Sequence, residues 1–231
     1  MLCVTCPNRD SGSCGTLLEA QSRTAHAVHG SNGPLLQIAR PGEQIVVRNQ
    51  TTQQVLVLCA GWAYRYVELA DGRRQILGFL LPGDLFSVLN LFEPLSQFSV
   101  AALTDVQVSR FERPGVRARG DRLQLVLENA SRDEHAGAIR LITVLGKCSA
   151  EERIAYLLTH LARRLRARSV IRGQSYPFPL RLRHIADALG LTPVHVSRVL
   201  SHFRDRGLCV ISNGVLNMLD EPELDRLGTV A

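Results

Sequence analysis

The chain has 231 residues, of which 45% are hydrophobic and 21% are charged, and its mean hydropathy is +0.03. These values are ordinary for a globular protein, and the length gives room for more than one hydrophobic core. No apolar run is long enough to span a bilayer, and the first residues, MLCVTCPNRD, lack the basic start and apolar stretch of a signal peptide. We therefore expect a two-domain cytoplasmic protein with no membrane partner. The net charge of +6 favours a polyanionic partner.

An N-terminal arm, residues 1–20, holds three cysteines in the pattern C-x2-C-x7-C, namely Cys3, Cys6 and Cys14. In a reducing cytosol such spacing indicates metal or redox chemistry more than a structural disulfide. Thiolates suit both zinc and iron-sulfur clusters, and each of these needs a fourth ligand. The spacing alone does not choose between them.

Residues 21–120 are expected to form a β-rich domain. Short strands separated by turns are predicted at 44–48, 54–59, 62–69, 75–81, 98–103 and 106–111. Turn signals such as Pro41-Gly42 and Pro82-Gly83 divide them, and Asp71-Gly72 is the clearest hairpin. Many short strands at regular spacing are typical of a barrel or roll.

Residues 121–148 follow with a helical pattern, and Asp121 to Lys147 is apolar on more than one side. Such a helix needs two surfaces to cover it: its own β domain and a symmetry mate. The alternative is a helix buried within a monomer. Two seams are candidates for dimer contacts, and Ile139, Ile142 and Leu145 are the residues that we assign to dimerisation. The two seams are His135, Ile139, Ile142 and Gly146, or Ala138, Leu141 and Leu145.

Residues 149–231 are predicted to form a winged helix-turn-helix. Ser149 and Glu152 form a capping box that opens a helix running through Arg166. Further on, LRHIADALGLTPVHVSRV, residues 182–199, has the apolar spacing of two crossing helices, with Gly190 at the turn. Thr192 and Pro193 are typical of the N-cap and first residue of the second helix. Asn213-Gly214 then predicts a hairpin, which would be the wing.

The outward face of the second helix is the candidate DNA-binding surface. Arg198 has two donors for a guanine edge, Ser197 reaches a base or phosphate, and Val194 offers apolar contact to a thymine methyl. The full predicted set is Thr192, Val194, His195, Ser197, Arg198, Ser201 and His202. The alternative is an ordinary helical hairpin packed in a core.

Arginines crowd the same region, with only Asp187 and Asp205 as carboxylates between Arg153 and Arg206. We expect some of these arginines to contact phosphates, whereas a solvated basic helix face explains others. They are Arg153, Arg163, Arg164, Arg166, Arg168, Arg172, Arg181, Arg183, Arg198, Arg204 and Arg206.

The order of β-roll, long helix and winged helix-turn-helix, an α+β fold, resembles the Crp/Fnr superfamily of bacterial transcription regulators over nearly the whole chain. Three segments carry the likeness: LLPGDLFSVLNLF at 80–92, CSAEERIAYLLTHLARRL at 148–165 and IADALGLTPVHVSRVL at 185–200. The resemblance implies a homodimer whose two recognition helices enter successive major grooves of a palindromic operator, with RNA polymerase as a further partner.

The cyclic-nucleotide-binding members of that superfamily hold the ribose and phosphate with a Gly-Glu pair and an Arg-Ser pair. The matching positions here are Ser87-Val88 and Phe98-Ser99. Without the arginine, a cyclic phosphate would be buried with no cationic partner. We therefore expect no binding of cyclic AMP, although another apolar effector in the roll stays open.

Oxygen-sensing Fnr proteins carry a similar N-terminal cysteine cluster that binds a [4Fe-4S] cluster, so the resemblance implies the same cofactor on Cys3, Cys6 and Cys14. The fourth Fnr cysteine corresponds to Ser109, which is a poor ligand. We assign Cys59 as the fourth ligand, and Asp105 or another, unidentified carboxylate is the second choice. The alternative for Cys59 is a buried thiol that acts as a small hydrophobe.

The remaining alternatives for the arm are thiol-disulfide or zinc chemistry, or no sensing role. Regulation would then depend on thiol oxidation or a small effector in the roll, without a cluster. Cys148 and Cys209 are predicted to be structural, although an exposed Cys148 would be a candidate thiol sensor.

The recognition helix also departs from the Fnr pattern, because Val194 stands where Fnr has a glutamate, while Ser197 and Arg198 match. The preferred half-site is therefore expected to differ from that of Fnr. An enzyme is not expected: the seven histidines are scattered, and HExxH, GxSxG and Walker-type motifs are absent from the sequence.

Overall fold

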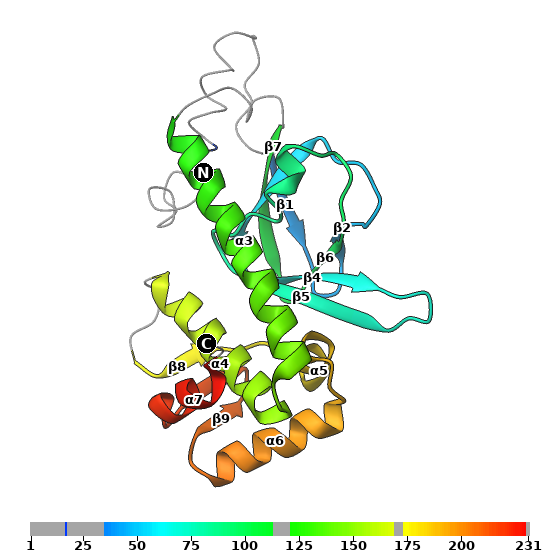
Figure 1. Ribbon diagram of the computed structural model, residues 1–231. Coiled ribbons are helices and arrows are strands. Elements are labelled where there is room, and N and C mark those ends of the chain that lie inside the picture. Colours follow the sequence, from blue (N-terminus) through cyan, green and yellow to red (C-terminus); the bar gives the residue numbers. More distant parts are fainter. Residues whose placement is uncertain (1–16, 18–34, 113–120, 169–172, 230–231) are drawn as a thin grey trace. The chain divides into compact units, whose positions relative to one another are not determined.

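A computed structural model describes residue 17 and residues 35–112, 121–168 and 173–229 of the chain (Figure 1). The chain divides into two compact units: Met1–Val67 with Gly78–His135, and Glu68–Leu77 with Ala136–Ala231.

Residues 35–112 form two antiparallel sheets, as predicted for a roll, and most of their strands belong to the first unit. One sheet has the order β1-β7-β3 and the other β2-β6-β4-β5. The strands are β1 (Leu35–Ala39), β2 (Gln44–Val46), β3 (Gln54–Ala60), β4 (Ala63–Glu68), β5 (Arg74–Leu80), β6 (Ser99–Ala102) and β7 (Val106–Glu112). Alternation along the strands gives each sheet a core-facing side. Residues of both sheets form one buried cluster, which includes Leu56, Leu58, Val100 and Val108.

The opposite face of the β1-β7-β3 sheet carries a second apolar cluster. Val55, Val57 and Phe111 alternate with the core residues and pack with Leu17 of the arm. Leu127 of α3 (Asp121–Lys147) packs against this cluster. The roll therefore buries apolar side chains on both faces of β3, which explains why β3 is a nearly continuous apolar run.

Three details of the roll differ from the sequence prediction. Strand β1 was not anticipated, because its sequence, LLQIA, does not alternate. Strand β2 ends at Val46 rather than at residue 48, since Asn49 adopts a left-handed conformation (φ 63°) and turns the chain. Strands β4 and β5 are joined by residues 69–73, a longer connection than a two-residue turn at Asp71-Gly72.

The second unit consists of helices and a small sheet. Its helices are α4 (Ala150–Ala167), α5 (Leu182–Leu189), α6 (Pro193–Asp205) and α7 (Glu221–Gly228), with the C-terminal part of α3. Strands β8 (Ser175–Pro177), β9 (Cys209–Ser212) and β10 (Val215–Met218) form an antiparallel sheet in the order β8-β10-β9. In the described residues no helix is long and apolar enough to cross a membrane.

Local signals fix the ends of several helices. The predicted capping box of α4 is present: the Glu152 N–H donates to Ser149 Oγ (3.3 Å) and the Ser149 N–H donates to Glu152 Oε2 (2.7 Å). These bonds lower the pKa of the Glu152 carboxyl.

Helix α7 was not anticipated from the sequence. It packs so closely on α4 that a Cβ at Gly228 would lie 2.6 Å from the backbone nitrogen of Tyr156.

Residues Glu68–Leu77 also belong to the second unit, because they contact α5. The Arg74 guanidinium forms an ion pair with Asp187 (2.6 Å), and the Gln75 amide donates to the carbonyl of Ala188 (3.0 Å). The Arg74–Asp187 pair is three-quarters buried at both ends, which excludes much of the solvent that would otherwise weaken it.

Candidate nucleic-acid interface

The predicted helix-turn-helix is formed by α5 and α6. Gly190 ends α5 in a left-handed conformation (φ 63°), and the following N–H, of Leu191, donates to the carbonyl of Ala186 (3.1 Å). A Cβ at Gly190 would meet its nearest neighbours at 3.8 Å, so the backbone conformation rather than crowding requires glycine. The residues between the two helices are buried: Ile185, Ala186, Leu189, Val196, Val199 and Phe203.

The start of α6 is capped as predicted. Thr192 Oγ1 accepts from the N–H of His195 (3.2 Å), and Pro193 occupies the first turn. The cap satisfies one of the otherwise unpaired N–H groups at the helix start and fixes the direction in which α6 leaves the turn.

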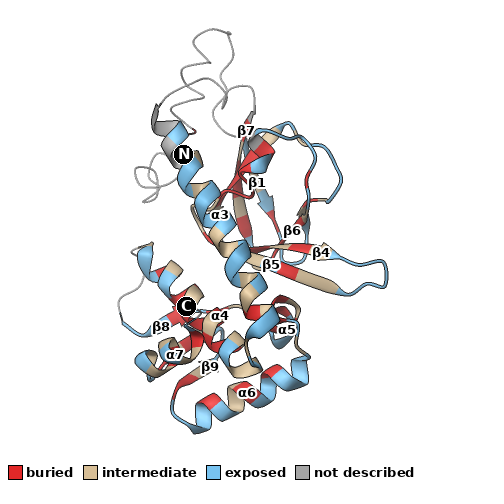
Figure 2. Cartoon of the chain, viewed as in Figure 1, coloured by how far each residue is buried: buried red, intermediate tan, exposed pale blue. Residues whose placement is uncertain are grey.

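The N-terminal half of α6 presents an exposed face. Val194 is 68% exposed, and His195, Ser197 and Arg198 are exposed as well. Figure 2 shows exposed positions along much of α6. Among the described residues no side chain pairs with the guanidinium of Arg198 or the hydroxyl of Ser197. Buried Val196 and Val199 lie between these positions, so the exposed residues share one face of the helix. This face is suited to contact a groove of DNA.

The last two residues of the predicted set have different surroundings. Ser201 is only half-exposed, and His202 Nδ1 lies 2.9 Å from Glu151 Oε1 at the start of α4. His202 therefore has a partner within its own unit, unlike the residues of the N-terminal half of α6. The sequence did not indicate this contact, because 51 residues separate its two members.

The wing follows α6 as predicted. Asn213 (φ 50°) and Gly214 (φ 74°) are both left-handed, as a type I′ turn requires, and they join β9 to β10. Leu216 and Met218 are buried beneath the hairpin, whereas the turn is exposed. The unanticipated strand β8 pairs with β10 and extends the wing to three strands.

Many of the clustered arginines contact groups of their own unit. Arg163 pairs with Asp225 (2.7 Å) and Arg166 with Glu221 (2.8 Å), both on α7. Arg153 donates to the carbonyl of Leu189 (3.0 Å), which ties α4 to the end of α5. These arginines stabilise the unit, and the charge cluster in the sequence did not separate them from Arg198.

His184 of α5 is a buried titratable group in the same unit. Its Nδ1 accepts from the Arg181 N–H (3.0 Å), which completes the start of the helix. Burial, together with the charges of Arg183 and Arg74, lowers the pKa of His184 to about 4. The imidazole is therefore neutral at physiological pH.

The residues predicted to mediate dimerisation lie along α3. Ile139 is 52% exposed and Ile142 is 72% exposed, and His135 and Gly146 of the same seam are exposed too. Leu145, of the second predicted seam, is half-buried. Exposed isoleucines at helical spacing leave the first seam free of intramolecular cover within the described part of the chain.

Two observations concern the predicted sensor. Cys3, Cys6 and Cys14 lie outside the described residues, and no group of three or more His, Cys, Asp or Glu side chains suited to a metal occurs among the residues described. Cys59 is half-buried on β3, and its Sγ lies 3.0 Å from the hydroxyl of Ser109 on β7. Cys59 is therefore a direct neighbour of Ser109, the position that corresponds to the fourth cysteine of Fnr.

Residues at the positions expected to hold a cyclic nucleotide contact other side chains of the first unit. Val88 is 5% exposed, and its N–H points to Glu134 Oε1 of α3 at 3.4 Å. The same carboxylate accepts from Arg65 Nη1 (2.9 Å), and the Arg65 guanidinium lies over the ring of Phe98 at 5.5 Å. Glu134 and Arg65 were not singled out in the sequence, since 69 residues separate them.

Comparison with known proteins agrees with this architecture. Residues 36–119 match the cyclic nucleotide-binding domain, and residues 152–227 match the Crp-like helix-turn-helix domain. The chain is 31% identical to the nitrogen fixation regulation protein FixK of Bradyrhizobium diazoefficiens, over 97% of this chain and 93% of that protein. The chain belongs to the Crp/Fnr family of transcription regulators.

Two further Crp/Fnr relatives support the assignment. The transcriptional activatory protein AadR of Rhodopseudomonas palustris is 34% identical over 81% of this chain and 78% of that protein. The solved structure of FixK2 from Bradyrhizobium japonicum has a TM-score of 0.78 and 27% identity, and covers 87% of this chain and 100% of the other. The predicted α+β fold is thereby confirmed, and the relatives are regulators rather than enzymes.

Proposed function

We propose that this Crp/Fnr regulator binds a palindromic operator as a homodimer, through the N-terminal half of α6. The guanidinium of Arg198, which is exposed and pairs with no side chain among the described residues, carries this proposal. An arginine on a recognition helix donates two hydrogen bonds to a guanine in the major groove. Thr192, Val194, His195 and Ser197 complete the contact surface, and Ser201 and His202 are assigned to its edge.

The homodimer is proposed to form along α3. Members of this family are typically dimeric, and the seam of Ile139 and Ile142 offers exposed apolar side chains at helical spacing. Leu145 is assigned to the flank of this seam. A two-fold dimer sets two α6 helices about one turn of DNA apart, which matches a palindromic operator. We place the protein in the cytoplasm, with RNA polymerase as a further partner.

We further propose that Cys3, Cys6, Cys14 and Cys59 hold an iron-sulfur cluster of the [4Fe-4S] type. The support comes from Leu17, which is buried beside Val57 on the face of the sheet that carries Phe111 and Ser109. Cys59 lies two positions beyond Val57 on β3. Cys14 stands three residues before Leu17 in the sequence, and three residues of extended chain span at most ~11 Å.

The donor chemistry of Cys59 fits this assignment. Its thiol is half-buried at the edge of an apolar cluster, and four thiolates are the usual ligands of a [4Fe-4S] cluster. Ser109 beside it supplies a hydroxyl at 3.0 Å, and hydrogen bonds of this kind tune the potential of ligating sulfur. When bound, the cluster would supply a group that reacts with oxygen or other oxidants.

The regulatory consequence is a shift between inactive and active populations. A stabilisation of the dimer by only about 1–3 kcal/mol changes operator occupancy severalfold to a hundredfold. The alternative is a regulator controlled by thiol oxidation or by a small effector in the roll. Half-buried Cys148, between α3 and α4, is the thiol that this alternative would use.

We also propose that cyclic AMP does not bind. Glu134 already accepts from Val88 and Arg65, so an incoming phosphate would meet a carboxylate in that position. Like charges at such short distance oppose binding. Calorimetry with cyclic AMP and the purified protein is expected to give no saturable heat. Tight binding would contradict this part of the proposal.

The cluster is tested by an anaerobic absorbance spectrum with iron and sulfide analysis. Wild type is expected to show a visible band that bleaches in air, and Cys6→Ser and Cys59→Ser to lose it. The matched control is Cys209→Ser, because Cys209 is buried and its pKa is raised to about 11, which keeps the thiol protonated.

Two outcomes revise the assignment in defined ways. Loss of the band in Asp105→Asn, with retention in Cys59→Ser, would move the fourth ligand to Asp105. Absence of iron from anaerobic wild type would remove the cluster and favour the thiol or effector alternative. Neither outcome affects the proposed DNA contacts of α6.

A further inference from the structure

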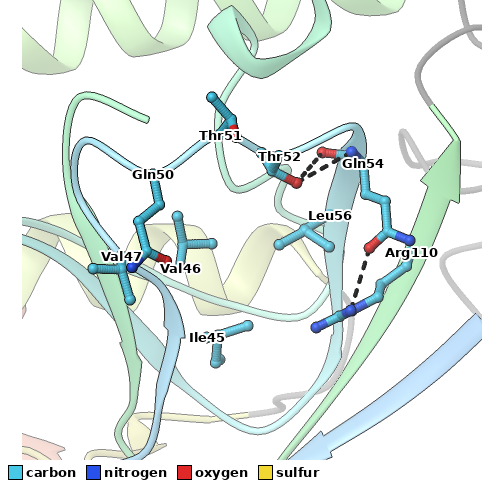
Figure 3. A pocket seen from close by; sticks show the side chains of 9 residues that line it. All are labelled: Ile45, Val46, Val47, Gln50, Thr51, Thr52, Gln54, Leu56 and Arg110. Carbon is cyan, nitrogen blue, oxygen red and sulfur yellow. Dashed lines mark hydrogen bonds between the residues drawn. The ribbon is translucent and has the colours of Figure 1, made fainter. Parts of the chain in front are cut away.

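A hollow of about 160 Å³ opens at one end of the β-roll. It is formed by the end of β2, the connection to β3, the start of β3 and one residue of β7 (Figure 3). None of the positions expected for a cyclic nucleotide lines it. The lining residues are Ile45, Val46, Val47, Gln50, Thr51, Thr52, Gln54, Leu56 and Arg110.

Arg110 is the only charged residue of this lining, and its position in the strand is unusual. In the register of the sheet Arg110 pairs with Leu56, and it lies on the same face as Val108. Both of those residues belong to the core between the sheets, so Arg110 is a cation on the core-facing side of β7. Charged side chains are rarely directed this way without a partner.

The partners of the guanidinium are uncharged. Nε and Nη2 of Arg110 donate to Gln37 Oε1, with an Nε–Oε1 distance of 2.9 Å, and Nη1 donates to Gln54 Oε1 (3.2 Å). No carboxylate pairs with Arg110 among the side chains that the structure describes. A half-buried cation held only by amide oxygens retains an uncompensated positive charge.

The guanidinium is directed at the hollow. In Figure 3 the side chain of Arg110 extends toward the side of the hollow where Ile45 and Leu56 lie, and Gln54 accepts a hydrogen bond from it. The two glutamines fix its orientation, and a pre-oriented guanidinium favours the two-pronged hydrogen bonding that a carboxylate accepts. The apolar side chains of Ile45, Val46 and Leu56 line the rest of this end.

The volume limits the size of the ligand. It is well above the ~10–15 Å³ that one water molecule needs, and below the ~300 Å³ at which pockets for drug-sized molecules begin. We propose that this hollow is a binding site for a short-chain aliphatic monocarboxylate, with its carboxylate on Arg110 and its hydrocarbon tail on Ile45, Val46 and Leu56. None of its lining residues belongs to α6 or to residues 1–20.

Thermal unfolding of the full chain, titrated with butyrate at constant ionic strength, tests this site. A ligand that binds only the folded state raises the melting temperature in a saturable way. Butyrate is expected to do so, whereas butyramide, which has the same shape without the charge, is not. Equal stabilisation by butyramide or by inorganic phosphate would overturn the proposed ligand class.

Variants separate the site from general charge effects. Arg110→Gln is expected to weaken butyrate binding by about tenfold or more, because it removes a charge-assisted hydrogen bond. Arg48→Gln is the matched control: Arg48 is exposed on the neighbouring connection, does not line the hollow, and its loss is expected to leave binding unchanged. Equal binding by wild type and Arg110→Gln would contradict the proposal.

A second variant in the lining provides an independent test in case Arg110→Gln does not fold. Gln50 is exposed at the rim, so Gln50→Glu keeps the size of the side chain and adds a negative charge without disturbing the core. It is expected to weaken butyrate binding by repulsion, at an unchanged melting temperature in the absence of butyrate. Unaltered butyrate binding by this variant would count against the site.

Discussion

Helices α4 and α6 are both rich in basic residues, yet their cations have different surroundings. On α4, Arg163 and Arg166 form ion pairs with carboxylates of α7. On α6, Arg198 is exposed and pairs with no described side chain. A basic cluster in a sequence therefore contains two kinds of arginine: those that form ion pairs within the domain and those that are available to bind a ligand.

Arg198→Ala is expected to have the largest effect on DNA binding. The loss of a two-pronged contact costs about 1–3 kcal/mol in each half-site, so a dimer loses its specific binding while its melting temperature stays unchanged. Fluorescence anisotropy with operator DNA and with random DNA measures the specific and the non-specific affinity. If operator affinity survived in this variant, the distinction between α4 and α6 would fail.

The buried imidazole of His184 tests a third charge environment in this unit. Burial lowers its pKa, and the charges of Arg183 and Arg74 lower it further. Its pKa of about 4 lies below the ordinary value of 6.5, so the unfolded chain takes up a proton first as the pH falls. Stability is therefore expected to be intact above pH 6.5 and to decline between about 6.5 and about 4.

His184→Gln keeps a side-chain acceptor for the Arg181 N–H but does not titrate. This variant is expected to flatten the pH dependence of unfolding, measured by denaturant titration at a series of pH values. An unchanged slope in the variant would mean that other groups cause the decline.

Val194→Glu tests whether residue 194, on the exposed face of α6, contacts the bases. A glutamate here can accept from cytosine N4, so the preferred half-site is expected to move toward that of Fnr, by about 1–3 kcal/mol of discrimination at one base pair. Competition between two operator sequences measures this shift. An identical preference in wild type and variant would show that residue 194 does not face the bases.

Thr192→Ala removes the cap that fixes the start of α6. Loss of the hydrogen bond to the His195 N–H is expected to lower the free energy of unfolding by about 1 kcal/mol. Thr192→Ser retains the acceptor and is the control. Chemical denaturation of both variants checks the effect; equal losses would point to the methyl group rather than to the cap.

Arg163→Ala is expected to have the smallest effect. The pair with Asp225 is partly exposed, and such pairs contribute between 0 and about 1 kcal/mol. Operator affinity should remain close to that of wild type. A loss comparable with that of Arg198→Ala would place α4 in the DNA contact as well.

Much of this architecture was predictable because local signals fix it. Thr192 and Pro193 mark the start of α6, Gly190 marks the turn before it, and Asn213-Gly214 marks the wing. Each of these signals depends only on residues that are neighbours in the sequence. Helix α7 had such a signal too, since Asp220 caps it and a proline lies in its first turn. That signal was overlooked rather than absent.

Contacts between distant segments were not predictable in the same way. Nothing in the local sequence joins Arg65 to Glu134 or His202 to Glu151, because strand pairing and helix packing bring them together. Strand β1 was missed for a related reason: it is an edge strand with exposed Leu35 and Ile38, so its sequence has no alternating pattern. The three arm cysteines remain a prediction from spacing.

The most direct test of the central proposal is selection of preferred duplexes from a random DNA library by the purified protein, with Arg198→Ala in parallel. We expect an inverted repeat whose half-sites lie about one helical turn, roughly 10 base pairs, apart, and no enrichment by the variant. A single unpaired half-site, or the same sequence enriched by wild type and variant, would contradict a dimer that binds DNA through α6.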